Sequence, residues 1–403
     1  MRVKPGEFLK LIILLSVIGK LLFVVLFINL NDLEYYEYGE LANNLYQGKG
    51  YSLSHPIDED VTEKVYKSAY MPPGYVIYLY PFFFIPDPVI RNLLIILSQI
   101  LISCILILLV YKYTRKYFSE TSALIAAAIT GFLPEFIFAS SQIQVTLFYH
   151  IGIIALLLQL YKLNEDKIRY DTFIFIGIIL GVLILFRSEI VLFAVLIIIY
   201  LINKKYHEGL IVIAGIILIF ILPWQIRNYV LFEEIIPFTT SAGLNLYRGH
   251  NPYYIGNWGD DSLNAQFRSI KDDENYEVKM NYIYLENAIK SIKENPDKEI
   301  IYPFIKLFHL WIMNPSYERT NHPIYFVPWF ALLLISIYGL IKSASWKNHK
   351  FTYLFLIFFN SVAIIFFALP RYQTMMKIAL VPFAAYGFEM ILHSRKIKLN
   401  KKK

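Results

Sequence analysis

Two carboxylates, Asp32 and Glu34, follow directly after the first long apolar run of this sequence. Carboxylates near a boundary of low dielectric constant are suited to act as general bases, because desolvation strengthens their hold on a proton. Aromatic and apolar residues at helical spacing, from Tyr35 to Leu45, predict an amphipathic helix on the membrane surface directly after them. Asp32 is therefore either a catalytic base or the cap of this helix, and its position alone leaves both interpretations open.

Cationic side chains stand where later apolar runs end, or within them. Arg187, Arg227 and Arg371 each lie at the end of a run, and Lys377 lies about a turn and a half deeper than Arg371. A guanidinium group can bind a phosphate through two parallel hydrogen bonds, and a lysine inside a membrane is costly enough to suggest a site. We therefore predict a phosphate site made by Arg371, Arg227, Arg187 and Lys377. For Arg227, contact with lipid phosphates is the alternative.

A rigid turn, Tyr70-Met-Pro72-Pro73-Gly74-Tyr75, separates the acidic motif from the second apolar run. Two prolines and a glycine force an extended bend, which is either a simple return into the membrane or one wall of a groove. Under the second interpretation, the sequence predicts a substrate groove lined by Tyr35, Tyr70, Pro72, Pro73, Tyr75 and Tyr372.

The composition shows what must position these side chains. Of the 403 residues, 57% are hydrophobic and only 17% are charged, and the apolar residues fall in long blocks. These values exclude a soluble enzyme, a nucleic-acid-binding protein, a coiled coil and a disordered linker. The net charge of +7 then indicates cytoplasmic anchoring loops and contact with membrane lipids, with no nucleic acid as partner. The single cysteine, Cys104, lies inside an apolar run and can form no intrachain disulfide.

We therefore predict an all-α polytopic membrane protein with about ten transmembrane helices and a single membrane domain over residues 1–403. The first apolar run has no cleavage site after it and is expected to stay as a helix. The expected spans lie near residues 8–30, 91–111, 120–139, 143–161, 172–186, 189–202, 208–227, 323–341, 351–369 and 373–392.

The distribution of positive charge predicts the orientation. Twenty of the 38 Lys and Arg residues lie in six short segments that fall on one side of the ten-span arrangement. By the positive-inside rule, both termini are then cytoplasmic. A single bent helix over 172–202 would give nine spans and would place the C-terminal lysines outside. Two long segments, 31–90 and 228–322, face outside in the ten-span arrangement, and the second should contain helices near 276–294 and 299–313.

Several kinds of catalytic motif are missing from the sequence. The eight histidines are scattered without the spacing of metal ligands, and no phosphate-binding glycine loop or Gly-x-Ser-x-Gly turn occurs. Hydrolysis of a nucleoside triphosphate is therefore not expected. A divalent cation between Asp32 and a phosphate is compatible with the acidic motif, although no residue pattern requires one.

Four motifs occur in an order that resembles the GT-C superfamily of polytopic glycosyltransferases. They are the acidic motif, the Pro-Pro-Gly-Tyr turn, the Pro-Trp-x-x-Arg-Asn segment that ends at Asn228, and the Arg371-Tyr372 pair. The resemblance covers roughly residues 8–390. It is strongest to the branch that contains the protein O-mannosyltransferases and the lipid A aminoarabinose transferases.

This resemblance implies a glycosyltransferase that takes a sugar from a polyprenyl-phosphate carrier, or a diphosphate carrier in some branches, and inverts its anomeric centre. The acceptor would be a protein, a lipid or a glycan on the non-cytoplasmic face. Asp32 would be the catalytic carboxylate, and Arg371 and Arg227 would hold the carrier phosphate. The protein O-mannosyltransferases have adjacent Asp and Glu residues, whereas here Leu33 separates Asp32 from Glu34.

The chemistry of this reaction agrees with the residue types. An inverting displacement needs a base opposite the leaving group, and the departing phosphate needs cations directed at it. Two alternatives remain open at this point: a membrane transporter or flippase, and a non-catalytic subunit of polysaccharide assembly. A transporter would be expected to show paired repeats, which the sequence lacks.

Overall fold

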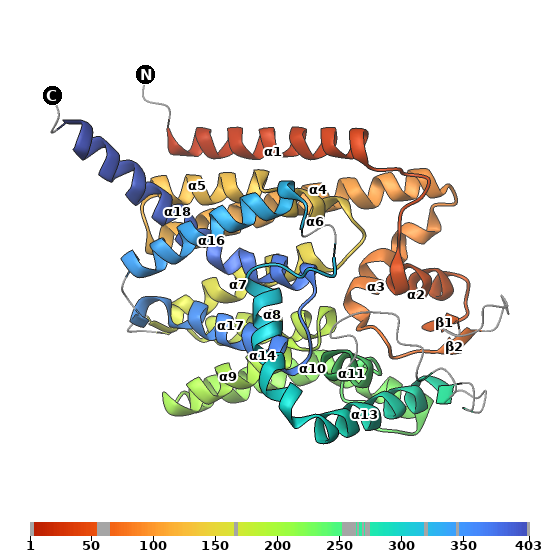
Figure 1. The fold of residues 1–403 in the computed structure, drawn as a ribbon. Helices are drawn as coiled ribbons and strands as arrows, with labels where there is room; N and C mark the ends of the chain where they lie inside the picture. Colours follow the sequence, from red (N-terminus) through yellow and green to blue (C-terminus); the bar gives the residue numbers. More distant parts are fainter. Residues whose placement is uncertain are drawn as a thin grey trace.

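The long apolar runs form helices in the computed structural model of the chain (Figure 1). The structure describes residues 4–54, 65–164, 168–251, 263, 266–267, 270, 275–317, 321–343 and 346–400. Parts of both predicted long segments lie outside these ranges. The apolar helices are α1 (Pro5–Phe27), α4 (Pro88–Tyr117), α5 (Glu120–Phe132), α6 (Pro134–Ser141), α7 (Thr146–Tyr161), α8 (Tyr170–Phe186), α9 (Ile190–Asn203), α10 (His207–Phe232), α16 (Pro323–Ser343), α17 (Trp346–Ile365) and α18 (Pro370–Asn400).

Within the described ranges, six helices are long and apolar enough to cross a membrane, namely α1, α4, α7, α10, α16 and α18. The pair α5 and α6 also passes this test, with a bend of 53° between them. Pro134 explains the bend, because it holds the preceding Leu133 in an extended conformation. Shorter apolar helices occur at α8, α9 and residues 349–365. The prediction of an all-α polytopic membrane protein is confirmed, while the count of ten spans stays a prediction.

Residues 172–202 form two helices, α8 and α9, and not one bent helix. The residues between them, Arg187 to Glu189, leave the helical path at Arg187, which is extended. A large apolar core joins α4, α7, α8, α9, α17 and α18. By contrast, α1 exposes a row of apolar side chains that includes Leu22 and Val25, as expected for a helix that faces lipid.

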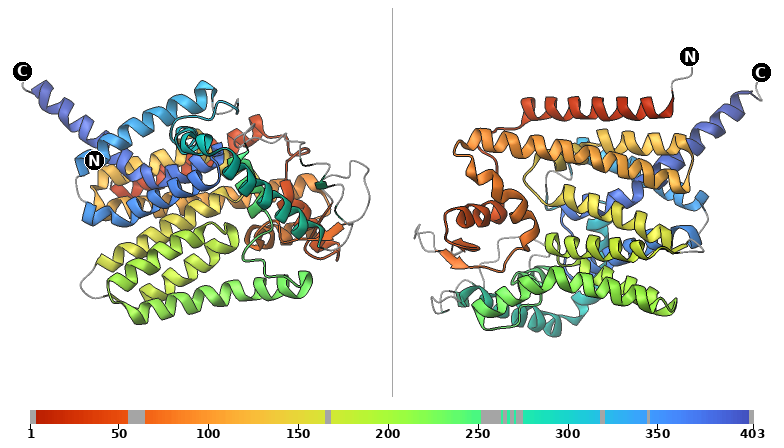
Figure 2. Two further views of the ribbon diagram at one scale, coloured as in Figure 1. Left: turned by 60° about the horizontal axis from the view of Figure 1, so that its bottom comes forward. Right: turned by 180° about the vertical axis from the view of Figure 1, so that it is seen from behind.

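The long segments that follow α1 and α10 gather at the end of the bundle opposite the two termini (Figures 1 and 2). We call this the loop end, and it contains α2 (Tyr36–Tyr46), β1 (Ser52–Ser54), β2 (Val65–Lys67), α3 (Pro73–Leu79) and α11 (Ala242–His250). The remaining elements are the short 3₁₀ helices η1 (Tyr80–Phe84) and η2 (Lys162–Asn164), and the helices α13 (Tyr276–Glu294) and α14 (Pro296–Trp311). The amphipathic helix and the two loop helices that the sequence predicts are thus present.

A small antiparallel hairpin follows α2, which the all-α prediction did not include. Strand β1 pairs with β2, and Leu53 stands opposite Tyr66. Gly48 and Gly50 have φ angles of 76° and 78°, in the left-handed region that favours glycine, so they can make the tight turn between α2 and β1.

Helices α16 and α18 approach each other closely through two glycines. A Cβ atom on Gly339 would lie 3.1 Å from the backbone nitrogen of Gly387, and it would also overlap the carbonyl oxygen of Phe383. Small residues permit such contact between backbones inside a membrane, where dispersion forces hold helices together. Ser336 adds a hydrogen bond across the pair, because its hydroxyl lies 3.4 Å from the carbonyl oxygen of Leu380.

Candidate active site

The ring of Tyr372 lies beside two guanidinium groups at the loop end. The guanidinium carbon of Arg187 is 5.0 Å from the ring centroid, and that of Arg371 is 5.6 Å away. Pro370 begins α18, which places Arg371 and Tyr372 in its first turn. Arg187 also binds Glu189, with 2.6 Å between Nε and the carboxylate. Two of the predicted phosphate ligands and one predicted groove residue therefore meet in space.

A third arginine, Arg248, joins this pair from the second long segment. It lies in the last turn of α11, is 4% exposed, and places its guanidinium carbon 4.4 Å from the ring centroid of Phe367. Burial lowers the pKa of Arg248, and the positive charge of Arg371 lowers it further. The sequence motifs did not identify Arg248, because it stands in a loop segment without a distinguishing pattern. We call Arg187, Arg248 and Arg371 the arginine cluster.

Two tyrosines from the first long segment border the arginine cluster. Burial raises the pKa of Tyr38, while the charges of Arg187 and Arg371 oppose that rise. Burial likewise raises the pKa of Tyr70, and the charge of Arg248 opposes it. Glu37 contributes to the raised pKa of both hydroxyl groups, so its carboxylate acts on the same region.

The arginine cluster brings three guanidinium groups to one region. Glu189 binds Arg187, and the charges of Glu37 and Glu277 act on the bordering Tyr70. Guanidinium groups bind anions such as phosphate through paired hydrogen bonds, so this region is suited to hold an anion. Arg371 is exposed and Arg187 is half-buried, which leaves the cluster open to a ligand.

The predicted catalytic carboxylates lie apart from these contacts. Asp32 and Glu34 are both exposed between α1 and α2, and within the described residues neither side chain makes a hydrogen bond or an ion pair. The first residue before α2 is Tyr35, which makes no side-chain cap. The helix-cap interpretation of Asp32 is therefore wrong, and its catalytic role stays a prediction.

Arg227 joins α10 to the first long segment. It donates hydrogen bonds to the backbone oxygens of Ser68 (2.6 Å) and Tyr51 (3.0 Å). Next to it, the buried carboxylate of Glu277 accepts hydrogen bonds from Ser68 Oγ at 2.6 Å and from the backbone nitrogen of Ala69 at 2.7 Å. Burial raises the pKa of Glu277, and these hydrogen bonds and the charge of Arg227 oppose the rise. In this structure the donors of Arg227 are directed at the protein and not at the arginine cluster.

Lys377 forms an ion pair with Glu135 that joins α18 to α6. Both side chains are buried, and the ammonium group lies 4.3 Å from the ring centroid of Trp329. The charge of Lys377 is thus compensated within the helix bundle, and no described contact links it to the arginine cluster.

The other predicted groove residues are packed between the first segment and the bundle. The Tyr35 hydroxyl bonds to Asn92 on α4, and the buried Tyr75 hydroxyl donates to Gln99 at 3.1 Å. Pro72 and Pro73 line a narrow cleft together with residues of α8, α10 and the segments that follow them: Ile184, Leu185, Ser188, Ile221, Trp224, Gln225 and Phe238. Gly74 lets α3 approach the end of α8, because a Cβ atom there would lie 2.7 Å from the Leu185 carbonyl oxygen.

No group of three or more His, Cys, Asp or Glu residues that could hold a metal ion occurs in the part of the chain that the structure describes. A divalent cation between Asp32 and a substrate phosphate, which the acidic motif allows, stays untested.

Comparison with known proteins relates this arrangement to a family and a fold. The family model described as dolichyl-phosphate-mannose-protein mannosyltransferase matches residues 90–226, from α4 to α10. No curated protein matches the sequence.

Solved structures match over nearly the whole chain. The oligosaccharyltransferase AglB from Archaeoglobus fulgidus, in complex with an inhibitory peptide and a dolichol-phosphate, has a TM-score of 0.58 at 12% identity, over 98% of this chain and 52% of that chain. The oligosaccharyltransferase from Archaeoglobus fulgidus tethered with an acceptor peptide gives a TM-score of 0.59 at 13% identity, over 97% of this chain and 50% of that chain. ArnT from Cupriavidus metallidurans, bound to undecaprenyl phosphate, gives a TM-score of 0.43 at 13% identity, over 93% of this chain and 77% of that chain.

The chain spans about half the length of the AglB structures that it matches. At these identities the likeness concerns the fold, and it agrees with the family match over α4 to α10. The resemblance to the GT-C glycosyltransferases that the motifs indicated is confirmed, and the chain has the fold of these polytopic membrane proteins.

Proposed function

We propose that the protein is a glycosyltransferase that moves a sugar from a polyprenyl-phosphate carrier to an acceptor, with inversion at the anomeric carbon. The observation that carries this proposal is the convergence of Arg187, Arg248 and Arg371 around Tyr372 at one end of a bundle of apolar helices. A lipid carrier would keep its chain in the bilayer and present its phosphate at this level.

The arginine cluster would act on the leaving group. When the bond between sugar and phosphate breaks, the carrier phosphate gains negative charge, and guanidinium groups already in place stabilise it without reorganisation. Arg187 is held by Glu189 and by the Tyr372 ring, so its position is fixed before the substrate arrives. Arg371 is exposed and would close on the phosphate from the solvent side.

A carboxylate of the first long segment would accept the proton of the acceptor. Asp32, with Glu34 beside it, is the residue that the sequence motif proposes, and both are exposed to an incoming acceptor. Glu37 is a second candidate, since its charge acts on Tyr38 and Tyr70 next to the arginine cluster. Substitution of each carboxylate in turn would identify the base.

We further propose that the reaction takes place on the non-cytoplasmic face. The termini lie together at the end of the bundle opposite the loop end, and the positive-inside rule predicts them in the cytoplasm (Figure 1). The acceptor would then be a protein, a lipid or a glycan of the cell envelope. The bound dolichol-phosphate and the acceptor peptide in the AglB structures support a lipid-linked donor and an acceptor at this fold.

Binding of a lipid phosphate to the purified protein tests the proposal directly. Farnesyl phosphate, a short-chain carrier analogue, should bind the wild type, and Arg371→Ala should weaken binding about 100-fold. Arg169→Gln is a matched control, because Arg169 forms an exposed ion pair with Asp171 at the opposite end of α8. A wild type that does not bind the analogue would reject the proposal.

Mass spectrometry of surface glycans and lipid-linked sugars from a deletion strain would then name the sugar and the acceptor. Movement of the carrier across vesicle membranes without sugar transfer would favour the transporter or flippase instead.

A further inference from the structure

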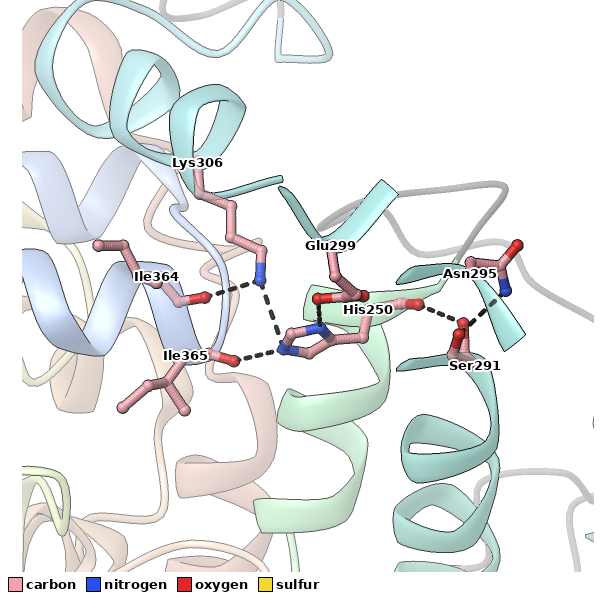
Figure 3. A network of polar contacts seen from close by, with 7 residues as sticks. All are labelled: His250, Ser291, Asn295, Glu299, Lys306, Ile364 and Ile365. Atoms are coloured by element: carbon pink, nitrogen blue, oxygen red, sulfur yellow. Dashed lines mark hydrogen bonds and ion pairs between the residues drawn. The ribbon is translucent and has the colours of Figure 1, made fainter. Parts of the chain in front are cut away.

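His250, Glu299 and Lys306 form a network of polar contacts (Figure 3), two residues along α11 from Arg248 of the arginine cluster. His250 is the last residue of α11, and its Nδ1 atom lies 2.7 Å from a carboxylate oxygen of Glu299 on α14. Its Nε2 atom lies 2.8 Å from the backbone oxygen of Ile365. Lys306, one per cent exposed, donates to the backbone oxygen of Ile364 at 2.8 Å.

His250 contacts both other side chains of the network through its ring. Its Nδ1 atom lies 2.7 Å from the Glu299 carboxylate, and its Nε2 atom lies 2.8 Å from the Ile365 backbone oxygen and 3.5 Å from Lys306 Nζ. The imidazole ring therefore links the carboxylate of Glu299 on one side to the ammonium group of Lys306 on the other.

This network fixes the end of α11 against the turn between α17 and α18. His250 bonds to Ile365, the backbone of Gly249 lies against the Phe366 carbonyl, and the Arg248 guanidinium lies over the Phe367 ring. Three consecutive residues of α11 thus contact three consecutive residues, the last of α17 and the first two of the turn. A side chain at position 249 would overlap the Phe366 carbonyl oxygen, so only glycine permits this approach.

The contacts control the placement of two arginines. Arg248 stands two residues before His250, and Arg371 follows shortly after the turn, in the first turn of α18. Ser291 on α13 adds a further restraint, because its hydroxyl donates to the His250 backbone oxygen at 2.6 Å. None of the three network side chains contacts an arginine of the cluster by a described bond, so their influence must pass through the backbone.

We propose that His250, Glu299 and Lys306 are positioning residues that set the distance between Arg248 and Arg371, and thereby the width of the anion site. This inference rests on the proposed function. Two guanidinium groups bind one phosphate group well only when their spacing matches it, and a displacement of about 1 Å can cost about 100-fold. The network holds the spacing by tying α11, α14 and the α17–α18 turn at one point.

A double-mutant cycle with farnesyl phosphate as the probe tests this role. Glu299→Gln and Lys306→Met should each weaken binding about 10- to 100-fold. Arg248→Ala removes the positioned group, so adding Glu299→Gln to Arg248→Ala should cause no further loss. Arg169→Gln should bind as the wild type does. The inference would be overturned if the fold-losses in affinity of Arg248→Ala and Glu299→Gln multiplied in the double variant. An unchanged affinity of Glu299→Gln would also overturn it.

Hydrogen exchange provides a second measurement that does not depend on the lipid. Glu299→Gln should speed the exchange of the Phe366, Tyr372 and Gln373 amides, which bond at the α17–α18 turn. Amides of α4 should exchange at the wild-type rate. Unchanged exchange at the turn would overturn the inference even if no lipid binds, whereas a wild type that fails to bind farnesyl phosphate would reject the proposed function alone.

Discussion

The guanidinium carbon of Arg187 lies 5.0 Å from the ring centroid of Tyr372, although Arg187 follows α8 and Tyr372 lies in the first turn of α18. Arg371 approaches the same ring to 5.6 Å. An aromatic ring attracts cations at its face, so Tyr372 can hold two like charges near each other before an anion binds.

Tyr372 should act mainly through its ring. Tyr372→Phe keeps the aromatic face, and we expect its affinity for farnesyl phosphate to stay within about threefold of the wild type. Tyr372→Leu removes a contact worth about 0.5–2 kcal/mol and should weaken binding about 3- to 30-fold. Calorimetric titration of both variants measures this difference. Equal losses in both variants would assign the effect to the hydroxyl instead.

Substitution of a carboxylate by its amide can distinguish the candidate bases of the first long segment, Asp32, Glu34 and Glu37. We expect Asp32→Asn to lower sugar transfer about 10²- to 10⁴-fold, as for loss of a general base, without weakening donor binding. Glu40→Gln is the control on the same segment, because Glu40 accepts hydrogen bonds from Ser54 and not from the site. Full transfer by Asp32→Asn together with loss in Glu37→Gln would make Glu37 the base.

Arg227 should matter for stability more than for donor binding. Arg227→Ala removes two charge-assisted hydrogen bonds to Ser68 and Tyr51, and should lower the free energy of unfolding by about 2–3 kcal/mol. We expect the remaining folded protein to bind farnesyl phosphate within about threefold of the wild type. Denaturant titration and lipid binding, measured in parallel with Arg371→Ala, check this. A loss of affinity as large as that of Arg371→Ala would show that Arg227 holds the phosphate.

Lys306 should make stability depend on pH in the alkaline range. Burial lowers its pKa from 10.5 to about 8, and the charge of Glu299 opposes this shift. Between these values the unfolded chain binds more protons than the folded protein, so the free energy of unfolding rises with pH. The rise is up to about 3 kcal/mol and should be absent in Lys306→Met. Denaturant titrations at pH 7 and pH 10 measure it, with the exposed Lys293→Met as control. An identical pH dependence in Lys306→Met and the wild type would contradict the lowered pKa.

The sequence could predict the elements and part of the candidate site. Long apolar runs have few alternatives to helices, because a membrane leaves no backbone group without a hydrogen bond. Arg187, Arg371 and Tyr372 were identifiable because each stands beside the end of an apolar run. Arg248 was not, since its position depends on contacts with residues more than a hundred positions away.

The sequence also did not show the carboxylates that neighbour two of the predicted phosphate ligands. Lys377 is paired with Glu135, and Arg227 lies beside Glu277, in both cases across a long stretch of chain. A sequence shows that a cation is present in an apolar setting, but it does not show which carboxylate folds against it.

The glycine contact between α16 and α18 limits how the site can move. Because the two backbones touch at Gly339 and Gly387, neither helix can slide along the other without a steric clash. We therefore expect any opening and closing at the arginine cluster to come from a hinge near Pro370, where α18 begins, or from the side chain of Arg371. Exchange of a ligand at the proposed anion site would then leave the packing of α16 against α18 unchanged.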